Sequence, residues 1–328
     1  MRRRDFLGVL GGAAAWPLVA RAQQAQPMRR IGVLSNLAED DPAMKARWAA
    51  FLQGLEKRGW SNGQNIRIDA RFGAADRDQL QARAGELVAL RPNVILANAP
   101  HVVAAVKRAN PTIPIVFVAV SDPVGAGFVA SLAQPGGNIT GLMNFEASIT
   151  GKWMAMLKEI APTLARAALV GNPQTTDFAY FLRAMEALAP SLAIEPIPIR
   201  VENAADIERM IESFARGATG GLVLPPDGTT ISHRDLIIAL AARHRLPAVY
   251  PFRFFVAAGG LMSYATDLSE QYRQAAAYVD QILRGANPTD LPVQTPTKYE
   301  TVINLKTAKT LGLTVPASLL VRADEIIE

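Results

Sequence analysis

Short, continuously apolar runs alternate with longer amphipathic segments along most of this chain of 328 residues, and this alternation constrains its fold more than any other feature. Strands of a parallel sheet that is covered by helices on both faces are apolar at nearly every position rather than at every second one. We therefore expect parallel strands at the following runs: Ile31–Leu34, Ile66–Ala70, Val94–Ala97, Ile113–Val120, Ala167–Val170, Gly221–Leu224, Pro247–Tyr250 and Leu261–Tyr264.

The segments between these runs have helical periodicity. In the first of them Trp48, Phe51, Leu52 and Leu55 share one stripe, and Gly59 follows as a stop. Helices are expected at Ala43–Arg58, Arg77–Leu90, Met154–Ile160, Asp177–Leu188, Ala205–Phe214, His233–Ala242 and Leu268–Leu283. A strand–helix–strand rhythm this regular implies right-handed crossovers, and hence an α/β protein with doubly wound parallel sheets.

The rhythm breaks at a few places, which we interpret as crossings between two lobes. Ser121–Gly141 holds five glycines and two prolines, the pattern changes again near Tyr264–Asp267, and Pro288–Pro296 is rich in proline. Three crossings predict an N-terminal lobe of residues 28–142 plus 268–286, and a C-terminal lobe of residues 145–262 plus 298–328. The chain is long enough for two lobes with separate cores.

The first residues have the pattern of a cleavable export signal. Three arginines, Arg2 to Arg4, precede the uncharged run Phe6–Val19, and Ala20-Arg21-Ala22 ends the segment. The apolar run is shorter than the roughly 20 residues that a membrane-spanning helix needs. Arg3–Leu7 also resembles the twin-arginine signal. We expect residues 1–22 to be a twin-arginine-like signal peptide cleaved after Ala22, and an ordinary secretory signal stays open as the alternative.

Charge and cysteine content exclude several classes of protein. The chain has 34 Lys and Arg against 29 Asp and Glu, and removing residues 1–22 leaves 30 against 28, so the net charge falls from +5 to +2. No basic patch with interleaved aromatics remains, and no nucleic-acid partner is expected. There is no cysteine, which excludes disulfides, thiolate metal sites and a bacterial lipoprotein anchor. We expect a mature protein that is free in the periplasm.

Polar and aromatic side chains follow the predicted strands, where loops meet at the carboxyl edge of each sheet. Ligands of open parallel sheets bind at this edge. The candidate ligand-binding residues are Ser35, Asn98, Ser121, Asp122, Asn144, Asn172, Asp227, Tyr250, Phe252, Ser263 and Tyr264. Each has a structural alternative, because Ser, Asn and Asp also cap helices or form turns, and the aromatics could be core residues.

No arrangement of residues in the sequence indicates catalysis. The three histidines, His101, His233 and His244, are not at metal-ligand spacing, and no nucleophile-elbow motif is present. The segment Gly125–Ala130 matches a dinucleotide fingerprint but does not follow its strand tightly, so a flexible turn accounts for its glycines. We expect no catalytic residues, no metal and no cofactor.

Several passages together resemble a known family. They are Arg3–Leu7 with Gly11–Leu18, Gly54-Leu55 to Gly63–Asn65, Ser121–Val124, Pro135–Gly141, Tyr250–Phe252, Ala257–Tyr264, Leu291–Gln294 and Ile303–Ala308. With these passages the chain resembles the periplasmic substrate-binding components of ABC importers, in the group that includes tryptophan- and tyrosine-type binding proteins, over essentially its whole length. Gln174-Thr175-Thr176 departs from the Asn-rich form of many relatives, so the resemblance does not carry an aromatic amino-acid specificity.

The resemblance implies a type I periplasmic-binding fold that closes on a small solute, such as an amino acid or aromatic compound. The family's ligand pocket corresponds to Ser35, Asn98, Asp122, Asn144, Asn172, Asp227 and Ser263. The implied partners are the solute, an ABC permease and, through the permease, its ATPase, and a monomer that is not an enzyme is expected. Two other functions stay open: a secreted α/β hydrolase-like enzyme, and a ligand-sensing module of a signalling system.

Overall fold

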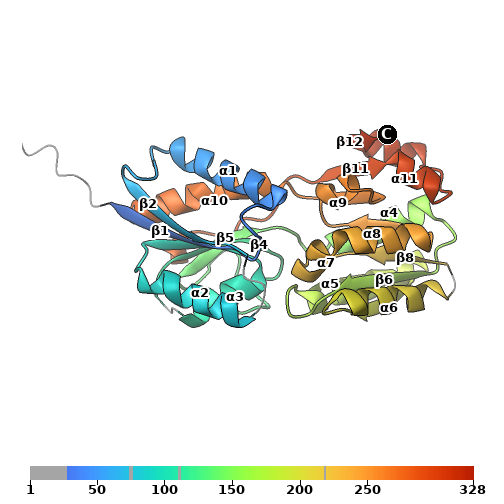
Figure 1. The fold of residues 1–328 in the computed structure, drawn as a ribbon, viewed down its shortest axis with the longest axis horizontal. Coiled ribbons are helices and arrows are strands. Elements are labelled where there is room, and N and C mark those ends of the chain that lie inside the picture. Colours follow the sequence, from blue (N-terminus) through green and yellow to red (C-terminus); the bar gives the residue numbers. More distant parts are fainter. Residues whose placement is uncertain (1–27, 74–76, 110–111, 218) are drawn as a thin grey trace, which may run out of the picture.

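The computed structural model describes residues 28–73, 77–109, 112–217 and 219–328, which form two α/β bodies side by side (Figure 1). The strands are β1 (Arg29–Leu34), β2 (Ile66–Arg71), β3 (Val94–Asn98), β4 (Ile115–Val120), β5 (Ile139–Met143), β6 (Arg166–Gly171), β7 (Glu195–Arg200), β8 (Gly220–Val223), β9 (Ala248–Tyr250), β10 (Met262–Ala265), β11 (Glu300–Asn304) and β12 (Glu325–Ile327). The helices are α1 (Pro42–Glu56), α2 (Arg77–Ala89), α3 (Pro100–Ala109), α4 (Ile149–Ile160), α5 (Phe178–Leu192), α6 (Ala204–Ala215), α7 (Gly228–Ser232), α8 (Arg234–Arg243), α9 (Arg253–Ala257), α10 (Leu268–Leu283), α11 (Leu305–Thr310), α12 (Ala317–Arg322) and the 3₁₀ helix η1 (Pro288–Asp290). Within these ranges, no helix has both the length and the apolar character needed to cross a bilayer. The signal peptide expected at residues 1–22 lies outside the described residues.

The N-terminal lobe, as we use the term, consists of β1–β5, α1–α3 and α10. Its sheet has the order β2-β1-β3-β4-β5, and every pair in it is parallel. Val94 and Leu96 of β3 pack with α1 and α10, whereas Ile95 and Ala97 pack with α2 and α3 on the other face. Because both faces are buried, residues 94–97 are all apolar and the polar Asn98 lies at the carboxyl end of the strand, which confirms the interpretation of the continuous runs.

Helix α10 packs against α1, although the two are more than 200 residues apart in sequence. A Cβ atom on Gly54 of α1 would lie 2.7 Å from the Cβ of Ala276 and 2.9 Å from the carbonyl oxygen of Arg273. The glycine therefore allows the two helices to touch. The indole nitrogen of Trp60 donates a hydrogen bond to Asp280 at 2.7 Å, which fixes the far end of the pair. The sequence predicted the bounds of α10 correctly.

The C-terminal lobe, as we use the term, consists of β6–β12 with α4–α9, α11 and α12, whereas η1 packs against β5 of the N-terminal lobe. Its sheet has the order β12-β11-β10-β9-β8-β6-β7, and β10 and β11 are antiparallel. The sheet is otherwise parallel, as expected, and the antiparallel pair involves β11, a strand that the sequence did not predict. The physical reason is the path of the chain: it leaves β10 for α10 in the other lobe and returns through residues 291–299 to the same end of the sheet, so β11 starts where β10 stops.

Several short elements have no counterpart in the sequence-based expectation. Strand β7 contains Pro196 and Pro198 and lies at the edge of the sheet, where a missing backbone donor is tolerated. Its prolines and exposed positions conceal the strand pattern. Strands β11 and β12 and helices α3, α7, α9, α11 and α12 were also not predicted, because most are too short for periodicity to be read.

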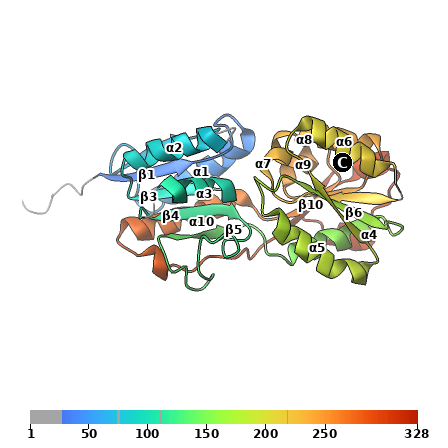
Figure 2. The same cartoon turned by 90° about the horizontal axis from the view of Figure 1, so that it is seen from below.

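The chain passes between the lobes at residues 144–148, 266–267 and 291–299 (Figure 2). Hydrogen bonds join these crossings to each other. The backbone nitrogen of Met143 donates to the carbonyl oxygen of Gln294 at 2.8 Å, and Nε2 of Gln271 donates to the carbonyl oxygen of Met143 at 3.1 Å and to Oγ1 of Thr266 at 3.2 Å. The glycine-rich segment after β4 stays on the N-terminal lobe, where Phe128 and Val129 are buried.

Candidate functional site

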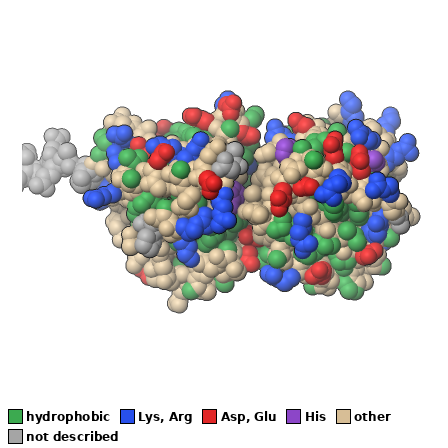
Figure 3. Space-filling model, turned by 60° about the horizontal axis from the view of Figure 1, so that its bottom comes forward, with side chains coloured by type: hydrophobic (Ala, Val, Ile, Leu, Met, Phe, Trp, Pro, Cys, Tyr) green, Lys and Arg blue, Asp and Glu red, His purple; other side chains and the backbone are tan. Residues whose placement is uncertain are grey.

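The carboxyl ends of the parallel strands in the two sheets face each other across the boundary between the lobes. A cavity of about 30 Å³, here called the central cavity, lies at this boundary. Asn36, Asn98 and Ala119 line it from the ends of β1, β3 and β4, and Thr175 and Asp227 line it from the loops after β6 and β8. Figure 3 shows the lobes meeting along a narrow furrow, so the opposed faces are close together.

The N-terminal wall of the central cavity is a pair of asparagines. Nδ2 of Asn98 donates to Oδ1 of Asn36 at 2.9 Å, and the backbone nitrogen of Asn36 donates to Oδ1 of Asn98 at 3.2 Å. Ser35 lies below this wall with its hydroxyl between Met44 and the backbone nitrogen of Leu37. Asn98 therefore lines the cavity, whereas Ser35 shapes the loop that carries Asn36.

The C-terminal wall is built around the buried carboxylate of Asp227. Its oxygens accept hydrogen bonds from the hydroxyl of Thr175 at 2.6 Å, the backbone nitrogen of Asn172 at 3.1 Å and the backbone nitrogen of Thr230 at 2.6 Å. Burial raises the pKa of Asp227, although these bonds act in the opposite direction. Asn172 in turn binds Thr229 through Nδ2 at 3.0 Å. Asp227 thus caps α7 and fixes the loop after β6 at the same time.

A second and larger cavity of about 420 Å³, here called the side cavity, shares Arg47, Phe252 and Leu268 with the central one. Arg47 comes from α1 and is almost fully buried, with its guanidinium carbon 5.7 Å from the centre of the Phe252 ring. Arg47 is not among the candidate residues chosen from the sequence. The available signal was its position on the buried stripe of α1 with Met44 and Phe51, where a cation interrupts an otherwise apolar face.

The four candidates of β9, β10 and their following loops lie in different surroundings. Phe252 and Ser263 line the side cavity, and the buried hydroxyl of Ser263 has no hydrogen-bond partner among the described residues. Tyr250 lies in the core with its ring stacked on Phe255 at 5.1 Å. Tyr264 stacks on Tyr299 at 5.2 Å. Neither tyrosine lines the central or the side cavity.

Ser121, Asp122 and Asn144 lie at another part of the lobe boundary. The hydroxyl of Ser121 donates to Oδ1 of Asn144 at 2.9 Å, and both residues are buried. The backbone nitrogens of Ser121 and Asp122 donate to one carboxylate oxygen of Asp177, at 3.2 and 3.1 Å. Asp177 belongs to the C-terminal lobe and precedes α5. These bonds therefore connect the two lobes directly.

Two titratable groups at the boundary have shifted pKa values. Burial raises the pKa of Asp177 to about 6, and the nearby charge of Asp122 adds to the effect, while the bonds from Asp122 and Ser121 oppose it. Burial lowers the pKa of His101, on α3, to about 4. Gly228 of the opposite lobe faces this imidazole, since a Cβ there would lie 3.9 Å from its Cε1 atom. Neither Asp177 nor His101 was among the site residues chosen from sequence.

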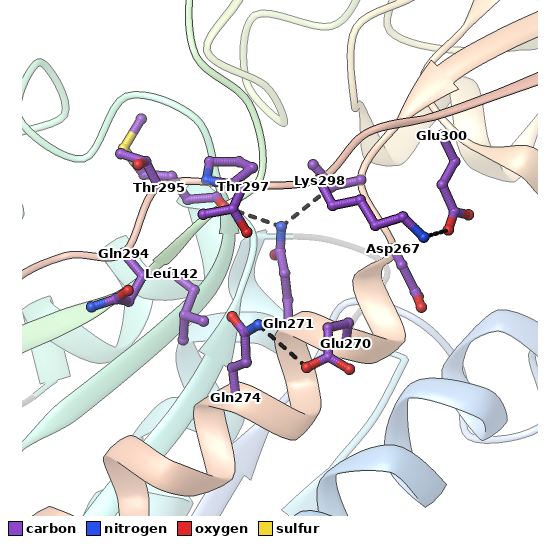
Figure 4. Close-up of a pocket in the computed structure, with 13 residues that line it drawn as sticks. Leu142, Asp267, Glu270, Gln271, Gln274, Gln294, Thr295, Thr297, Lys298 and Glu300 are labelled. Atoms are coloured by element: carbon purple, nitrogen blue, oxygen red, sulfur yellow. Dashed lines mark hydrogen bonds and ion pairs between the residues drawn. The ribbon is translucent and has the colours of Figure 1, made fainter. Parts of the chain in front are cut away.

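A further cavity of about 300 Å³ lies on the hinge rather than between the two walls (Figure 4). Glu270, Gln271 and Gln274 enter it from α10, and Lys298 and Glu300 enter it from the third crossing. Its charged groups are engaged: Lys298 pairs with Glu300 at 2.9 Å, and Glu270 pairs with Arg273. This cavity adjoins the side cavity, with which it shares Thr266, Asp267 and Glu300, and it has no lining residue in common with the central cavity.

The described residues include no group of three or more His, Cys, Asp or Glu side chains with the arrangement of a metal site. The polar groups of the two interlobe cavities are amides, hydroxyls, two arginines and carboxylates, most of which are already engaged. Such a lining can bind a small polar solute by hydrogen bonds and charge.

Comparison with known proteins gives a consistent result. The sequence model of the family described as "ABC transporter substrate binding protein" matches residues 30–327. A tyrosine-binding protein of Clostridioides difficile is 26% identical over 289 residues, which cover 88% of this chain and 82% of that protein.

Solved structures are similar over the same length. A conserved domain protein of Vibrio cholerae superposes with a TM-score of 0.85 at 28% identity, covering 91% of this chain and 99% of that one. A Streptococcus pneumoniae ABC domain in complex with L-Trp also gives a TM-score of 0.85, at 23% identity and with the same coverage. These structures share the two-lobe fold of periplasmic solute-binding proteins.

Proposed function

Because the chain belongs to the family of ABC transporter substrate-binding proteins, we propose that it captures its solute between the two lobes, in the space formed by the central and side cavities. Proteins of this family bind small solutes and deliver them to an ABC permease, and the chain is a substrate-binding protein rather than an enzyme. The observation that carries the proposed site is that strand-end loops of both sheets line one cavity.

Within this site, residues from both lobes contact the solute. We assign this role to Asn98 and Arg47 of the N-terminal lobe and to Asp227, Phe252 and Ser263 of the C-terminal lobe. A solute that touches both lobes binds the closed state better than the open one and therefore shifts the population toward closure. Ser35, Asn144, Asn172, Ser121 and Asp122 support the loops and the boundary.

The proposed solute is an amino acid or an aromatic compound. Two similar proteins support this: one is named a tyrosine-binding protein, and the other has a solved structure in complex with L-Trp. A thermal-shift screen of the purified chain without residues 1–22 tests this, with amino acids, aromatic acids and nucleosides as the library. A solute at 100 times its Kd adds about 2.7 kcal/mol to the free energy of unfolding. The proposal fails if no member of the library shifts the melting temperature.

The chain acts outside the cytoplasm, free in the periplasm, after cleavage of the twin-arginine-like signal at Ala22, and it acts as a monomer. Members of this family are typically extracytoplasmic, which supports the location. Mass spectrometry of the N-terminus in a periplasmic fraction tests the cleavage. Replacement of both Arg3 and Arg4 by lysine is expected to stop export by the twin-arginine route, and unchanged export would indicate the ordinary secretory route.

A further inference from the structure

Arg47 has a surrounding that is unusual for an arginine. Only 5% of its surface is exposed, and within the described part of the chain no hydrogen bond or ion pair involves its guanidinium. Its guanidinium carbon lies over the face of the Phe252 ring, 5.7 Å from the ring centre. Desolvation by burial lowers its pKa, although Tyr272, Asp41 and Asp267 act in the opposite direction.

The carboxylates near Arg47 are engaged elsewhere. The carboxylate of Asp41 accepts hydrogen bonds from the backbone nitrogens of Ala43 and Met44 at the start of α1. The carboxylate of Asp267 accepts a hydrogen bond from the backbone nitrogen of Ser269 at the start of α10, at 2.7 Å. The remaining acidic groups of the two cavities are also engaged, since Glu300 pairs with Lys298 and Asp227 holds three hydrogen bonds.

A buried arginine without a partner is costly to the folded protein. The guanidinium stays protonated at all ordinary pH values, so it cannot relieve the cost by losing its proton. A cation–π contact offsets only part of the lost hydration. An unbranched apolar side chain would fill the same position on the stripe of α1 without this cost. Stability of the ligand-free protein therefore does not explain an arginine here.

Arg47 faces space that a solute can occupy. Its side chain lines both the central and the side cavity. The side cavity also contains the buried hydroxyl of Ser263, which has no partner among the described residues and can donate a hydrogen bond. A cation with a planar fork of donors and a neighbouring hydroxyl is a suitable receptor for a carboxylate.

We propose that Arg47 binds a carboxylate of the solute, so that this receptor selects monoanionic or zwitterionic carboxylates over neutral molecules of the same shape. The inference rests on the proposed function and deepens it. A monoanion fits better than a dianion such as a phosphate ester, because Asp41 and Asp267 lie near Arg47 and the other arginine of the side cavity, Arg253, is paired with Glu325. The body of the solute then extends toward the wall formed by Asn98 and Asp227.

Matched pairs of ligands test the inference. L-tryptophan, L-tyrosine, phenylacetate and benzoate are each compared with the corresponding amide by calorimetry and thermal shift on the chain without residues 1–22. We expect the carboxylates that bind to exceed their amides by about ten- to hundredfold in affinity, because a charge-assisted hydrogen-bonded pair is lost in the amide. Arg47→Gln should abolish this preference, and Arg47→Lys should keep part of it.

Lys45→Gln is the matched control, because it removes the same charge from an exposed position of the same helix. It should leave the preference unchanged. A readout without ligand accompanies it: Arg47→Met should raise the melting temperature of the ligand-free protein by about 2–4 °C, since it removes an unpaired buried charge.

The outcomes separate the inference from the proposed function. Equal affinity for a carboxylate and its amide, or a carboxylate preference that survives in Arg47→Gln, overturns the role of Arg47 while solute binding stands. A fall in the melting temperature of ligand-free Arg47→Met shows that the residue stabilises the empty protein and also counts against the inference. Absence of any binding across the ligands and the wider library contradicts the proposed function, and the inference with it.

Discussion

The carboxylate of Asp177, on the C-terminal lobe, accepts the backbone amide hydrogen of Ser121, on the N-terminal lobe, across 3.2 Å. The next amide, that of Asp122, binds the same oxygen at 3.1 Å. These bonds join the two lobes at a point outside the central cavity, because neither Asp177 nor Ser121 lines it. The contact between the lobes therefore does not need the solute, and we expect it to favour closure.

Removal of this carboxylate should weaken closure. Asp177→Ala leaves two backbone donors without their acceptor, and we expect solute affinity to fall by about 1–3 kcal/mol. Asp177→Asn keeps an acceptor oxygen and should retain most of the affinity. Calorimetry with any solute found in the screen, together with small-angle scattering of the bound protein, measures both effects. Glu208→Ala, at an exposed position of the same lobe, is the control, and an equal loss there would contradict the assignment.

The pH dependence of closure should contain two opposing parts. Asp177 has a pKa raised from 3.8 to about 6, so its contribution favours the closed state below pH 4 and is lost as the pH rises through 6. His101 has a pKa lowered from 6.5 to about 4, so its contribution is present above pH 6.5 and is lost as the pH falls toward 4. The two contributions oppose each other, so the solute affinity of the wild-type protein should change little between about pH 4 and about pH 6.5.

Single variants should separate the two parts. In Asp177→Asn only His101 remains, and affinity should fall as the pH is lowered from about 7 to about 5. In His101→Asn only Asp177 remains, and affinity should rise over the same interval. Titration calorimetry at several pH values measures the slopes. Slopes of the same sign in both variants would show that these groups do not carry the pH dependence.

Gly54 should tolerate no side chain. A Cβ there would contact Ala276 and the Arg273 carbonyl at distances too short for carbon, so Gly54→Ala must separate α1 from α10. We expect a loss of about 1–3 kcal/mol in the free energy of unfolding. Gly85 of α2 has open space around it, and Gly85→Ala should instead add about 0.5–1 kcal/mol. Urea denaturation of both variants checks the pair, and equal effects would refute the close packing of α1 on α10.

The hinge should depend on Gln271. Its amide nitrogen connects the first crossing, at Met143, to the second, at Thr266. Gln271→Leu breaks both bonds and leaves the Met143 carbonyl unpaired, which should lower the free energy of unfolding by about 1–2 kcal/mol. Gln274→Leu, one turn away and exposed, should have an effect within about 0.5 kcal/mol. Thermal unfolding followed by circular dichroism gives the difference, and similar values for the two variants would exclude a special role for Gln271.

The sequence identified the interlobe boundary but not the roles of the residues there. Asn98, Asp227 and Phe252 follow their strands and line the central cavity, as reasoning from the carboxyl ends of parallel strands implies. Tyr250 was chosen by the same reasoning and lies in the core. The difference is set by whether the side chain points along the strand end or back onto α9, and the sequence carries no signal for that.

What the sequence determined by itself was the local pattern. Continuous apolar runs fixed the strands of β3 and β4, and a 3.6-residue stripe fixed α10 to its last residue, because burial on both faces or on one face leaves a periodic record in the chain. Only the tertiary structure decided which distant segments meet. It placed α10 against Gly54, brought Asp177 to Ser121, and left the guanidinium of Arg47 at the wall of a cavity with no hydrogen bond from the described residues. Periodicity records that a face is buried, whereas the identity of the partner depends on distances in space between residues far apart in the chain.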